Sequence, residues 1–280
     1  MSLPPANGRF RRGEGEKSMR ALTILFGAAL TAAALTAAPA WAQDVPADAG
    51  DKVDAGQNVA KADDTAAAAE EEEPTKPFTF ELDLTAVSDY RFRGISLSDK
   101  DPAFQPSFTV SHESGFYGSV WGSNVADNGG DDIEIDLIAG YATTLGTFDV
   151  DVNATYYAYP GADNLDYWEL IGTVSHAVGP ATVGALFAFT PKQDDTMPKR
   201  GIYYALNGEL PLGDSGIALT ASFGIEDNAF YDNKRDWSLG VSGEVLGFSV
   251  GAAYVGTSHT GGDPLGNDGI VVSVGRAFEF

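Results

Sequence analysis

The sequence contains no cysteine, which excludes a disulfide framework and any site that uses a thiolate as a metal ligand or nucleophile. Basic residues are also scarce, with 17 Lys and Arg against 40 Asp and Glu, and the formal net charge is −23. A protein this acidic repels the phosphates of nucleic acids, so we expect no nucleic-acid partner. The mean hydropathy of −0.11 does not exclude a membrane protein, because half of the strand residues of a transmembrane barrel face water.

Histidine is rare as well, and its three positions have no metal-ligand spacing. His112, His176 and His259 lie in separate segments, and we expect neither a metal site nor a cofactor. His112–Ser114 matches the His-x-Ser of an outer-membrane phospholipase. Because these residues fall in a predicted periplasmic turn, we interpret the match as chance and predict that the protein is not an enzyme.

Residues 1–42 are predicted to be a cleaved signal peptide. Basic residues precede an apolar run that ends on Ala40-Trp41-Ala42, and this pattern of small residues suits signal peptidase. Met19 also begins a complete signal peptide, so the sequence leaves the start open between Met1 and Met19. The segment predicts export.

Residues 43–77 are predicted to be an acidic, disordered linker. The segment holds six Asp and four Glu against three Lys and almost no large apolar side chain. Such a composition cannot bury enough surface to offset the entropy of ordering the chain. We therefore expect the folded part to begin near Phe78 and to extend to Phe280.

From Phe78 onward the sequence alternates with a period of two, which is typical of strands with two different faces. In residues 78–93 large apolar side chains occupy even positions and polar side chains occupy most odd positions. The same alternation returns in "DIEIDLIAGYATTL" (132–145), "TFDVDVNATYYAY" (147–159) and "DWSLGVSGEVL" (236–246). The pattern predicts strands with one apolar and one polar face.

Twelve segments of this kind can be counted, and their connections alternate between short and long. The predicted strands are 78–93, 104–112, 115–125, 132–145, 147–159, 165–177, 181–190, 201–211, 216–226, 235–246, 248–257 and 269–280. Tight turns such as "ESG" and "GT" alternate with long polar loops such as "GISLSDKDPA" and "SHTGGDPLGN". This asymmetry is typical of transmembrane barrels of the bacterial outer membrane. The fold class predicted is all-β: a transmembrane, antiparallel, up-and-down β-barrel of twelve strands.

The last predicted strand carries a second feature that is typical of outer-membrane barrels. Its apolar face includes Ile270, Val272 and Val274, and it ends on the aromatic Phe280. A terminal aromatic strand resembles the assembly signal of bacterial outer-membrane proteins. We therefore expect three partners: the barrel-assembly machinery, outer-membrane lipid and lipopolysaccharide. The oligomeric state stays open.

The first predicted strand interleaves aromatic and basic residues in "SDYRFRGIS" (88–96). We expect Tyr90 and Phe92 to face lipid and Arg91 and Arg93 to face the lumen near the outer mouth. The candidate pore-lining residues are Arg91, Arg93, Asp83, Asp89, Glu134, Asp136, Asp149 and Asp151.

Two roles for these arginines stay open. In the first they plug the lumen, ion-paired with facing acids such as Asp132 and Glu134. In the second they form one wall of a transverse electric field that selects ions. The number of strands does not decide between a filled and an open barrel.

The segment "SDYRFRGISLSDKDPAFQPSF", followed by "GFYGSVWGSNV", resembles the TorF family of predicted porins. The resemblance covers residues 78–280 and implies an outer-membrane barrel that forms a pore, without identifying a solute. We accordingly expect a narrow channel for the passive diffusion of small hydrophilic solutes or ions. The alternative is a non-conducting barrel with a structural or surface-binding role.

Overall fold

The computed structural model describes residues 77–126, 132–162, 165–193 and 196–280. The predicted signal peptide (1–42) and all but the last residue of the predicted linker (43–77) lie outside these ranges. Within the described ranges no helix has the length and apolar character needed to cross a membrane.

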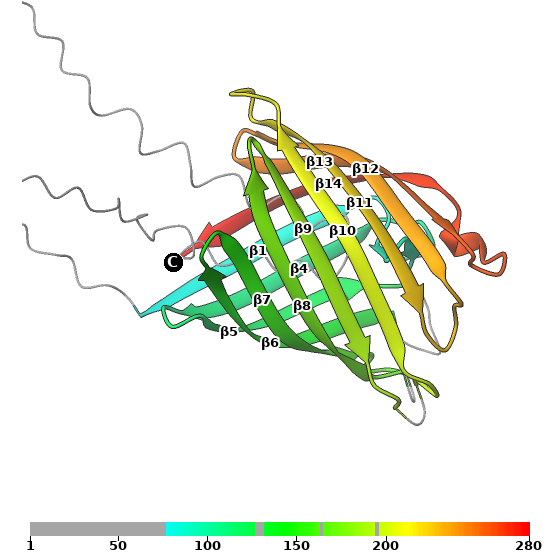
Figure 1. The fold of residues 1–280 in the computed structure, drawn as a ribbon. Coiled ribbons are helices and arrows are strands. Elements are labelled where there is room, and N and C mark those ends of the chain that lie inside the picture. The colour runs from blue at the N-terminus through cyan, green and yellow to red at the C-terminus, as the bar shows by residue number, and fades with distance from the viewer. Residues whose placement is uncertain (1–76, 127–131, 163–164, 194–195) are drawn as a thin grey trace, which may run out of the picture.

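Twelve antiparallel strands close into a barrel in which each strand pairs with its neighbours in the chain and β1 closes on β14 (Figure 1). The barrel strands are β1 (Phe78–Val87), β4 (Ala103–His112), β5 (Phe116–Asn124), β6 (Ile133–Leu145), β7 (Phe148–Ala158), β8 (Tyr167–Val178), β9 (Ala181–Thr190), β10 (Gly201–Pro211), β11 (Ile217–Asp227), β12 (Lys234–Val245), β13 (Phe248–Ser258) and β14 (Gly269–Glu279). A short hairpin of β2 (Arg91–Phe92) and β3 (Ile95–Ser96) stands apart from this sheet, and a 3-10 turn (Pro264–Gly266) precedes β14.

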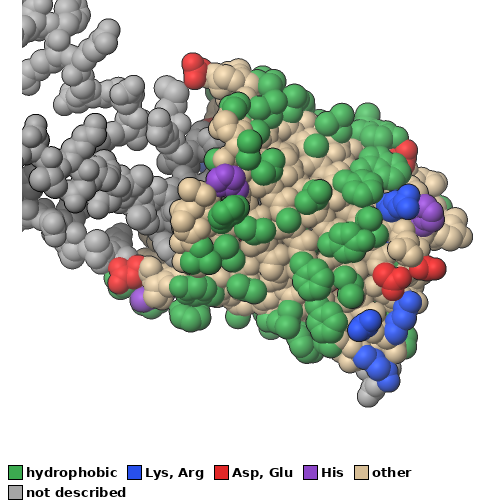
Figure 2. Space-filling view, viewed as in Figure 1, with side chains coloured by type: hydrophobic (Ala, Val, Ile, Leu, Met, Phe, Trp, Pro, Cys, Tyr) green, Lys and Arg blue, Asp and Glu red, His purple; other side chains and the backbone are tan. Residues whose placement is uncertain are grey.

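The alternation in the sequence separates a lipid face from a lumen face. On β6, Leu137 and Leu145 point outward and are about half-exposed or more, whereas Glu134 and Asp136 point inward and are buried. Hydrophobic side chains cover the outer wall between the two ends of the barrel (Figure 2). Because this outer surface is apolar and the barrel leaves no strand edge unpaired, the structure is a transmembrane β-barrel, as predicted.

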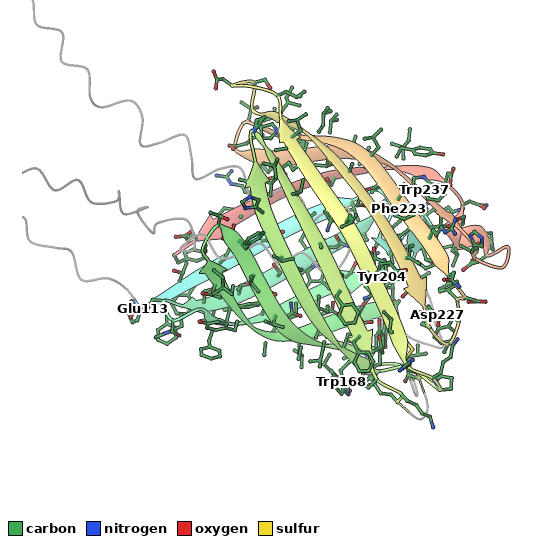
Figure 3. All side chains as sticks on the ribbon, viewed as in Figure 1. Glu113, Trp168, Tyr204, Phe223, Asp227 and Trp237 are labelled. Carbon is green, nitrogen blue, oxygen red and sulfur yellow. The ribbon has the colours of Figure 1, made fainter. Side chains whose placement is uncertain are left out.

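The connections also divide as predicted. Five turns at one end span two to five residues, and the six connections at the other end are longer, with the chain termini lying at the short-turn end. Glu113 lies at the short-turn end, whereas Trp168, Tyr204, Phe223 and Trp237 project from the half nearer the long loops (Figure 3). Aromatic side chains at this level are typical of the girdle at a membrane interface. We call the long-loop end the outer end.

The first strand is shorter than predicted, and this corrects the expected position of two aromatic residues. The chain leaves the barrel wall after Val87 and enters the lumen as the inner loop, which we define as residues 88–102. Tyr90 is 1% exposed and packs edge-on against Trp121, and Phe92 packs against Tyr157 inside the barrel. Neither faces lipid. The period of two persists through the β2–β3 hairpin, so alternation alone did not show where the wall ends.

The lumen is filled at its outer end and more open at the short-turn end. Lumen-facing side chains near the outer ends of β6 to β14, among them Asp136, Tyr157 and Lys234, are almost fully buried. Toward the short turns the inward side chains of Asp83 and Asp149 are only partly buried. The inner loop accounts for this difference because it occupies the outer part of the lumen.

Candidate functional site in the outer lumen

The inner loop is built around Asp89. Its carboxylate accepts hydrogen bonds from Arg91 Nε at 2.7 Å and from Ser96 Oγ at 2.6 Å, and this holds the two sides of the β2–β3 hairpin together. Arg91 Nη1 also donates to the carbonyls of Gly94 at 3.1 Å and Asn267 at 2.8 Å. The hairpin is therefore fixed both internally and to the loop before β14.

The tip of the hairpin lies close against the barrel wall. Gly94 adopts a φ of +84°, and a side chain there would contact Thr257 Cγ2 on β13 and would lie 2.9 Å from Asp236 Cβ on β12. Glycine meets both requirements, since it tolerates positive φ and lacks a Cβ. The tip thus fits only because position 94 has no side chain.

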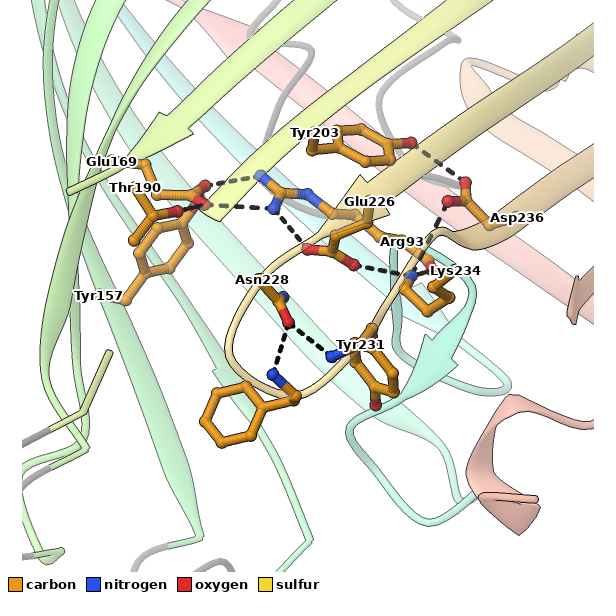
Figure 4. A network of polar contacts seen from close by, with 11 residues as sticks. Arg93, Tyr157, Glu169, Thr190, Tyr203, Glu226, Asn228, Tyr231, Lys234 and Asp236 are labelled. Carbon is orange, nitrogen blue, oxygen red and sulfur yellow. Dashed lines mark hydrogen bonds and ion pairs between the residues drawn. The ribbon is translucent and has the colours of Figure 1, made fainter. Parts of the chain in front are cut away.

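Arg93 carries the inner loop across the lumen to the opposite wall (Figure 4). Its guanidinium pairs with Glu169 on β8, with Nη2 to Oε2 at 2.6 Å, and with Glu226 on β11, with Nη1 to Oε1 at 2.8 Å. It also lies 4.4 Å from the ring centroid of Tyr203 on β10. Thr190 and Tyr157 donate hydrogen bonds to the same Glu169 carboxylate.

Lys234 adds a second buried cation beside Arg93. Its Nζ lies 2.9 Å from Glu226 Oε2 and 3.8 Å from Asp236 Oδ2, and it donates to the backbone carbonyl of Arg93. The Tyr203 hydroxyl donates to Asp236 Oδ1 at 3.0 Å. We call Arg93, Glu169, Glu226, Lys234 and Asp236 the crossing network. It joins the inner loop to β8, β11 and β12, which lie three to five strands away from β1 around the barrel.

The eight predicted lumen residues all lie on the inner surface or in the inner loop, but they do not form one cluster. The buried members are Asp89, Arg91, Arg93, Glu134, Asp136 and Asp151, and the partly buried members are Asp83 and Asp149. The expected pairing of the arginines with Asp132 and Glu134 is wrong, because the inner loop turns Arg93 toward β8 and β11 instead. Asp132 is exposed.

Lys234 was missed by the sequence analysis because the predicted strand began one residue later, at position 235. The signal was present, since Lys234 precedes Asp236 by two residues and therefore shares its face. Glu169 and Glu226 also lie on predicted strands, at alternating positions that face inward. Their pairing with Arg93 could not be predicted, because it depends on the path of the inner loop.

Two carboxyl groups of β6 lie outside the crossing network. Glu134 and Asp136 are 1% and 0% exposed, and they interact electrostatically with each other. Tyr159, in the loop after β7, lies beside them. Burial, followed by the charges of Glu134 and Asp136, raises the pKa of the Tyr159 hydroxyl above its ordinary value. Its hydroxyl therefore stays protonated and can donate a hydrogen bond.

A cavity of about 200 Å³ lies at the outer mouth, above the crossing network. Its walls come from the inner loop, from the outer ends of β8, β9 and β11, and from the loops after β7, β9 and β11. They include Phe92, Tyr167, Met197 and Phe230, with Arg93 beside them. The cavity is thus mostly apolar and is lined in part by the inner loop.

The His-x-Ser stretch lies at the short-turn end of the barrel, where His112 is the last residue of β4 and Ser114 lies in the turn that follows. His112 Nδ1 lies 2.7 Å from Ser114 Oγ, and the His112 ring packs edge-on against Phe78 near the start of the barrel. The predicted position in a short turn is confirmed for Glu113 and Ser114, whereas His112 ends the strand. The pair stacks and hydrogen-bonds locally at the exposed rim.

Three solved structures illustrate the similarity of the barrel to known porins. The KdgM porin is 8% identical with a TM-score of 0.48, and the match covers 72% of this chain and 99% of that one. The NanC porin is 10% identical with a TM-score of 0.47, covering 70% and 98%. An outer-membrane channel from Pseudomonas putida F1 is 9% identical with a TM-score of 0.45, covering 77% and 100%. These similarities concern the fold alone.

The family comparison covers almost all of the barrel. No curated protein matches the chain. A family model described as "Bacterial protein of unknown function (Gcw_chp)" matches residues 71–278, from before β1 to the end of β14. The chain therefore belongs to the Gcw_chp family of bacterial proteins of unknown function.

Proposed function

We propose that the protein is a narrow outer-membrane channel for small hydrophilic solutes and ions, with a preference for cations. The observation that carries the proposal is the acidic lumen. Among the buried side chains of the described residues inside the barrel, seven carboxyl groups (Asp89, Glu134, Asp136, Asp151, Glu169, Glu226 and Asp236) accompany three cations (Arg91, Arg93 and Lys234). Excess negative charge on a pore wall attracts cations and repels anions.

The half of the lumen nearer the short turns supports the same proposal. Asp83 and Asp149 lie toward the short turns, are partly exposed and point into the lumen. Asp83 accepts a hydrogen bond from Thr85 and Asp149 accepts one from Thr144, and the ion pairs among the described residues give neither carboxyl group a cationic partner. Ions that enter from this end meet an acidic wall before they reach the crossing network.

The cellular setting follows from the sequence signals together with the barrel. The proposal places the protein in the outer membrane after cleavage of the signal peptide near Ala42. The aromatic strand that ends at Phe280 would be recognised by the barrel-assembly machinery, and the apolar wall would contact lipid and lipopolysaccharide. The resemblance to the TorF porins supports this setting. We infer no role in catalysis.

The test is the ion selectivity of the refolded protein in planar bilayers. Under a potassium chloride gradient, the reversal potential should show a preference for K⁺ over Cl⁻. Asp83→Asn combined with Asp149→Asn should reduce that preference, because it removes two charges from the lumen wall. Asp227→Asn is the matched control, since Asp227 is exposed outside the lumen, where it pairs with Lys199. An anion preference of the native protein, or equal effects of the two variants, would contradict the proposal.

A non-conducting barrel is the second candidate, and the crossing network favours it. Arg93 and Lys234 link the inner loop to β8, β11 and β12 through buried ion pairs, so that side chains fill the outer lumen. A barrel that refolds fully but passes no current at any voltage would support this structural role over the channel.

A further inference from the structure

Glu134 and Asp136 form a buried pair of carboxyl groups on the lumen face of β6. Their spacing of two residues places both side chains on one face of the strand. Both are almost completely buried, and each lies within the electrostatic field of the other. Among the described residues, no ion pair joins either group to a Lys or Arg.

The oxygens of this pair are also short of hydrogen bonds. Glu134 Oε2 and both carboxylate oxygens of Asp136 have no hydrogen-bond partner within the described part of the chain. Glu226, at a similar burial, pairs with both Arg93 and Lys234. A buried carboxylate without a positive partner is strongly unfavourable, so the pair calls for a compensating positive charge.

The inner loop supplies a separate observation about the position beside Glu134 and Asp136. The Tyr90 hydroxyl lies beside the Glu134 carboxyl and interacts with it, but the contact does not reach hydrogen-bond geometry, and the hydroxyl has no other hydrogen-bond partner among the described residues. Tyr90 is 1% exposed, and Tyr159 faces Glu134 from the loop after β7. Two elements besides β6 therefore supply oxygen atoms to one buried position.

We propose that Glu134, Asp136 and Tyr90 bind a hard divalent cation, for which Ca²⁺ is the fitting ion. The donors are all oxygens, which excludes a preference for softer metals that favour sulfur and nitrogen. Two carboxylates supply the charge that a divalent ion neutralises. Ca²⁺ tolerates irregular oxygen shells, whereas Mg²⁺ demands a near-ideal octahedron. Because the described residues contain no group of three or more His, Cys, Asp and Glu suited to a metal, the proposal requires the Tyr90 hydroxyl and water oxygens to complete the shell.

The site has a structural consequence for the inner loop. Tyr90 belongs to the inner loop, and Glu134 and Asp136 belong to the wall, so a bound ion ties the loop to β6. The crossing network ties the same loop to the opposite wall through Arg93. The proposal does not depend on conduction, because a non-conducting barrel would bind the ion equally well.

The proposal can be tested with Tb³⁺ on the refolded protein in detergent. Tb³⁺ replaces Ca²⁺ at oxygen sites, and nearby aromatic rings sensitise its luminescence. Tb³⁺ should give a saturable emission excited through tyrosine, and Ca²⁺ should displace it. Glu134→Gln combined with Asp136→Asn should abolish the saturable emission. The control is Glu113→Gln combined with Asp227→Asn, which also removes two carboxylates but at exposed positions outside the lumen, and it should leave the emission unchanged.

The unfolding midpoint gives an independent measurement. Ca²⁺ should raise the midpoint of the native protein and of the control variant, because an ion that binds only the folded state stabilises it. Tyr90→Phe should weaken Ca²⁺ binding about tenfold and keeps the test available if the double variant does not fold. The proposal is overturned if emission does not saturate, if it survives in the site variant, or if Ca²⁺ leaves the native midpoint unchanged. If Ca²⁺ leaves the native midpoint unchanged, the carboxyl groups of Glu134 and Asp136 are neutralised by protons instead.

Discussion

Arg93 shows how one side chain can decide the shape of a lumen. Its planar guanidinium suits two carboxylates at once, and Glu169 and Glu226 approach it from different strands at 2.6 and 2.8 Å. Arginine is preferred at buried positions of this kind because it is always charged and its donors have a fixed geometry. The same residue lies over the ring of Tyr203, which contributes a favourable contact with the aromatic face.

The first prediction concerns the loss of this cation. Arg93→Ala leaves the carboxylates of Glu169 and Glu226 buried with fewer partners, and breaking a buried pair in this way costs about 3–5 kcal/mol. We expect a lower free energy of unfolding, measured from the urea midpoint in detergent micelles. Lys199→Ala is the control, because its 3.7 Å pair with Asp227 is half-exposed and contributes about 1 kcal/mol or less. Equal losses in both variants would show that the crossing network does not stabilise the barrel.

At the residue scale, the sequence predicted which face a side chain occupies better than it predicted its partner. Glu134, Asp136 and Asp151 face the lumen as their positions in the alternation required. The partner of Arg93 could not be inferred, because Glu169 and Glu226 are 76 and 133 residues away in the chain. Pairings of this separation depend on how the barrel closes, which local periodicity does not encode.

The inner loop is the element that distinguishes this barrel from an unobstructed cylinder. Its hydrogen bonds include Ser88 N to Val272 O at 2.8 Å and Ala126 N to Leu97 O at 2.7 Å, so its first residue is attached to β14 and Leu97 is attached to the loop after β5. The twelve predicted segments correspond to the twelve barrel strands, and their boundaries are close to those predicted. The exception is the first predicted strand, which ends earlier than predicted. Its end was misplaced because a hairpin folded into the lumen keeps the same alternation as a strand in the wall.

The second prediction tests how tightly the tip of this loop fits. Gly94→Ala should be more destabilising than Gly262→Ala, although both glycines have positive φ, +84° and +91°. The backbone strain of about 1–2 kcal/mol is common to both. Only position 94 adds a collision with β12 and β13, since position 262 has open space. The comparison uses urea midpoints, and equal midpoints would mean that the tip does not contact the wall.

The third prediction tests the lipid face of β6 at two depths. Leu137→Arg, near the middle of the strand, should cost about 2–4 kcal/mol, because the guanidinium would enter the hydrocarbon core. Leu145→Arg, at the short-turn end of the same strand, should cost about 1 kcal/mol or less, because it can reach the interface. The native Arg276, which stacks on the rings of Phe248 and Phe278 near that end, shows how an outward arginine is accommodated.

Unfolding of both variants from lipid vesicles measures these costs. A cost that does not change with depth would contradict the placement of β6 across the membrane.

On the scale of the whole molecule, the barrel combines an apolar exterior with an acidic interior whose outer end is filled. The fold was predictable from the sequence because period-two alternation and the sidedness of the connections recur through the whole of residues 78–280. The filling of the outer lumen was not predictable from the sequence, because a single loop with an unremarkable composition produces it. Twelve strands enclose enough space either for side chains or for a narrow aqueous path.

The fourth prediction follows from the exposed apolar wall. The mature chain should fold only in detergent or lipid, and the folded barrel should migrate faster than the heated chain in a denaturing gel. The reason is that the closed hydrogen-bonded sheet resists detergent at room temperature and opens only on heating. A detergent-free, monodisperse monomer with a cooperative melt would contradict a membrane barrel.

The central claim is that the inner loop limits passage through the outer lumen, and single-channel conductance tests it most directly. The comparison is between the native protein and a variant in which residues 90–97 are replaced by a Gly-Ser segment of equal length. This replacement removes Tyr90, Arg91 and Arg93 from the lumen and keeps the connection between β1 and β4. We predict a several-fold higher conductance with retained cation preference, since the acids of the wall remain. Equal conductance of the two proteins would contradict the claim.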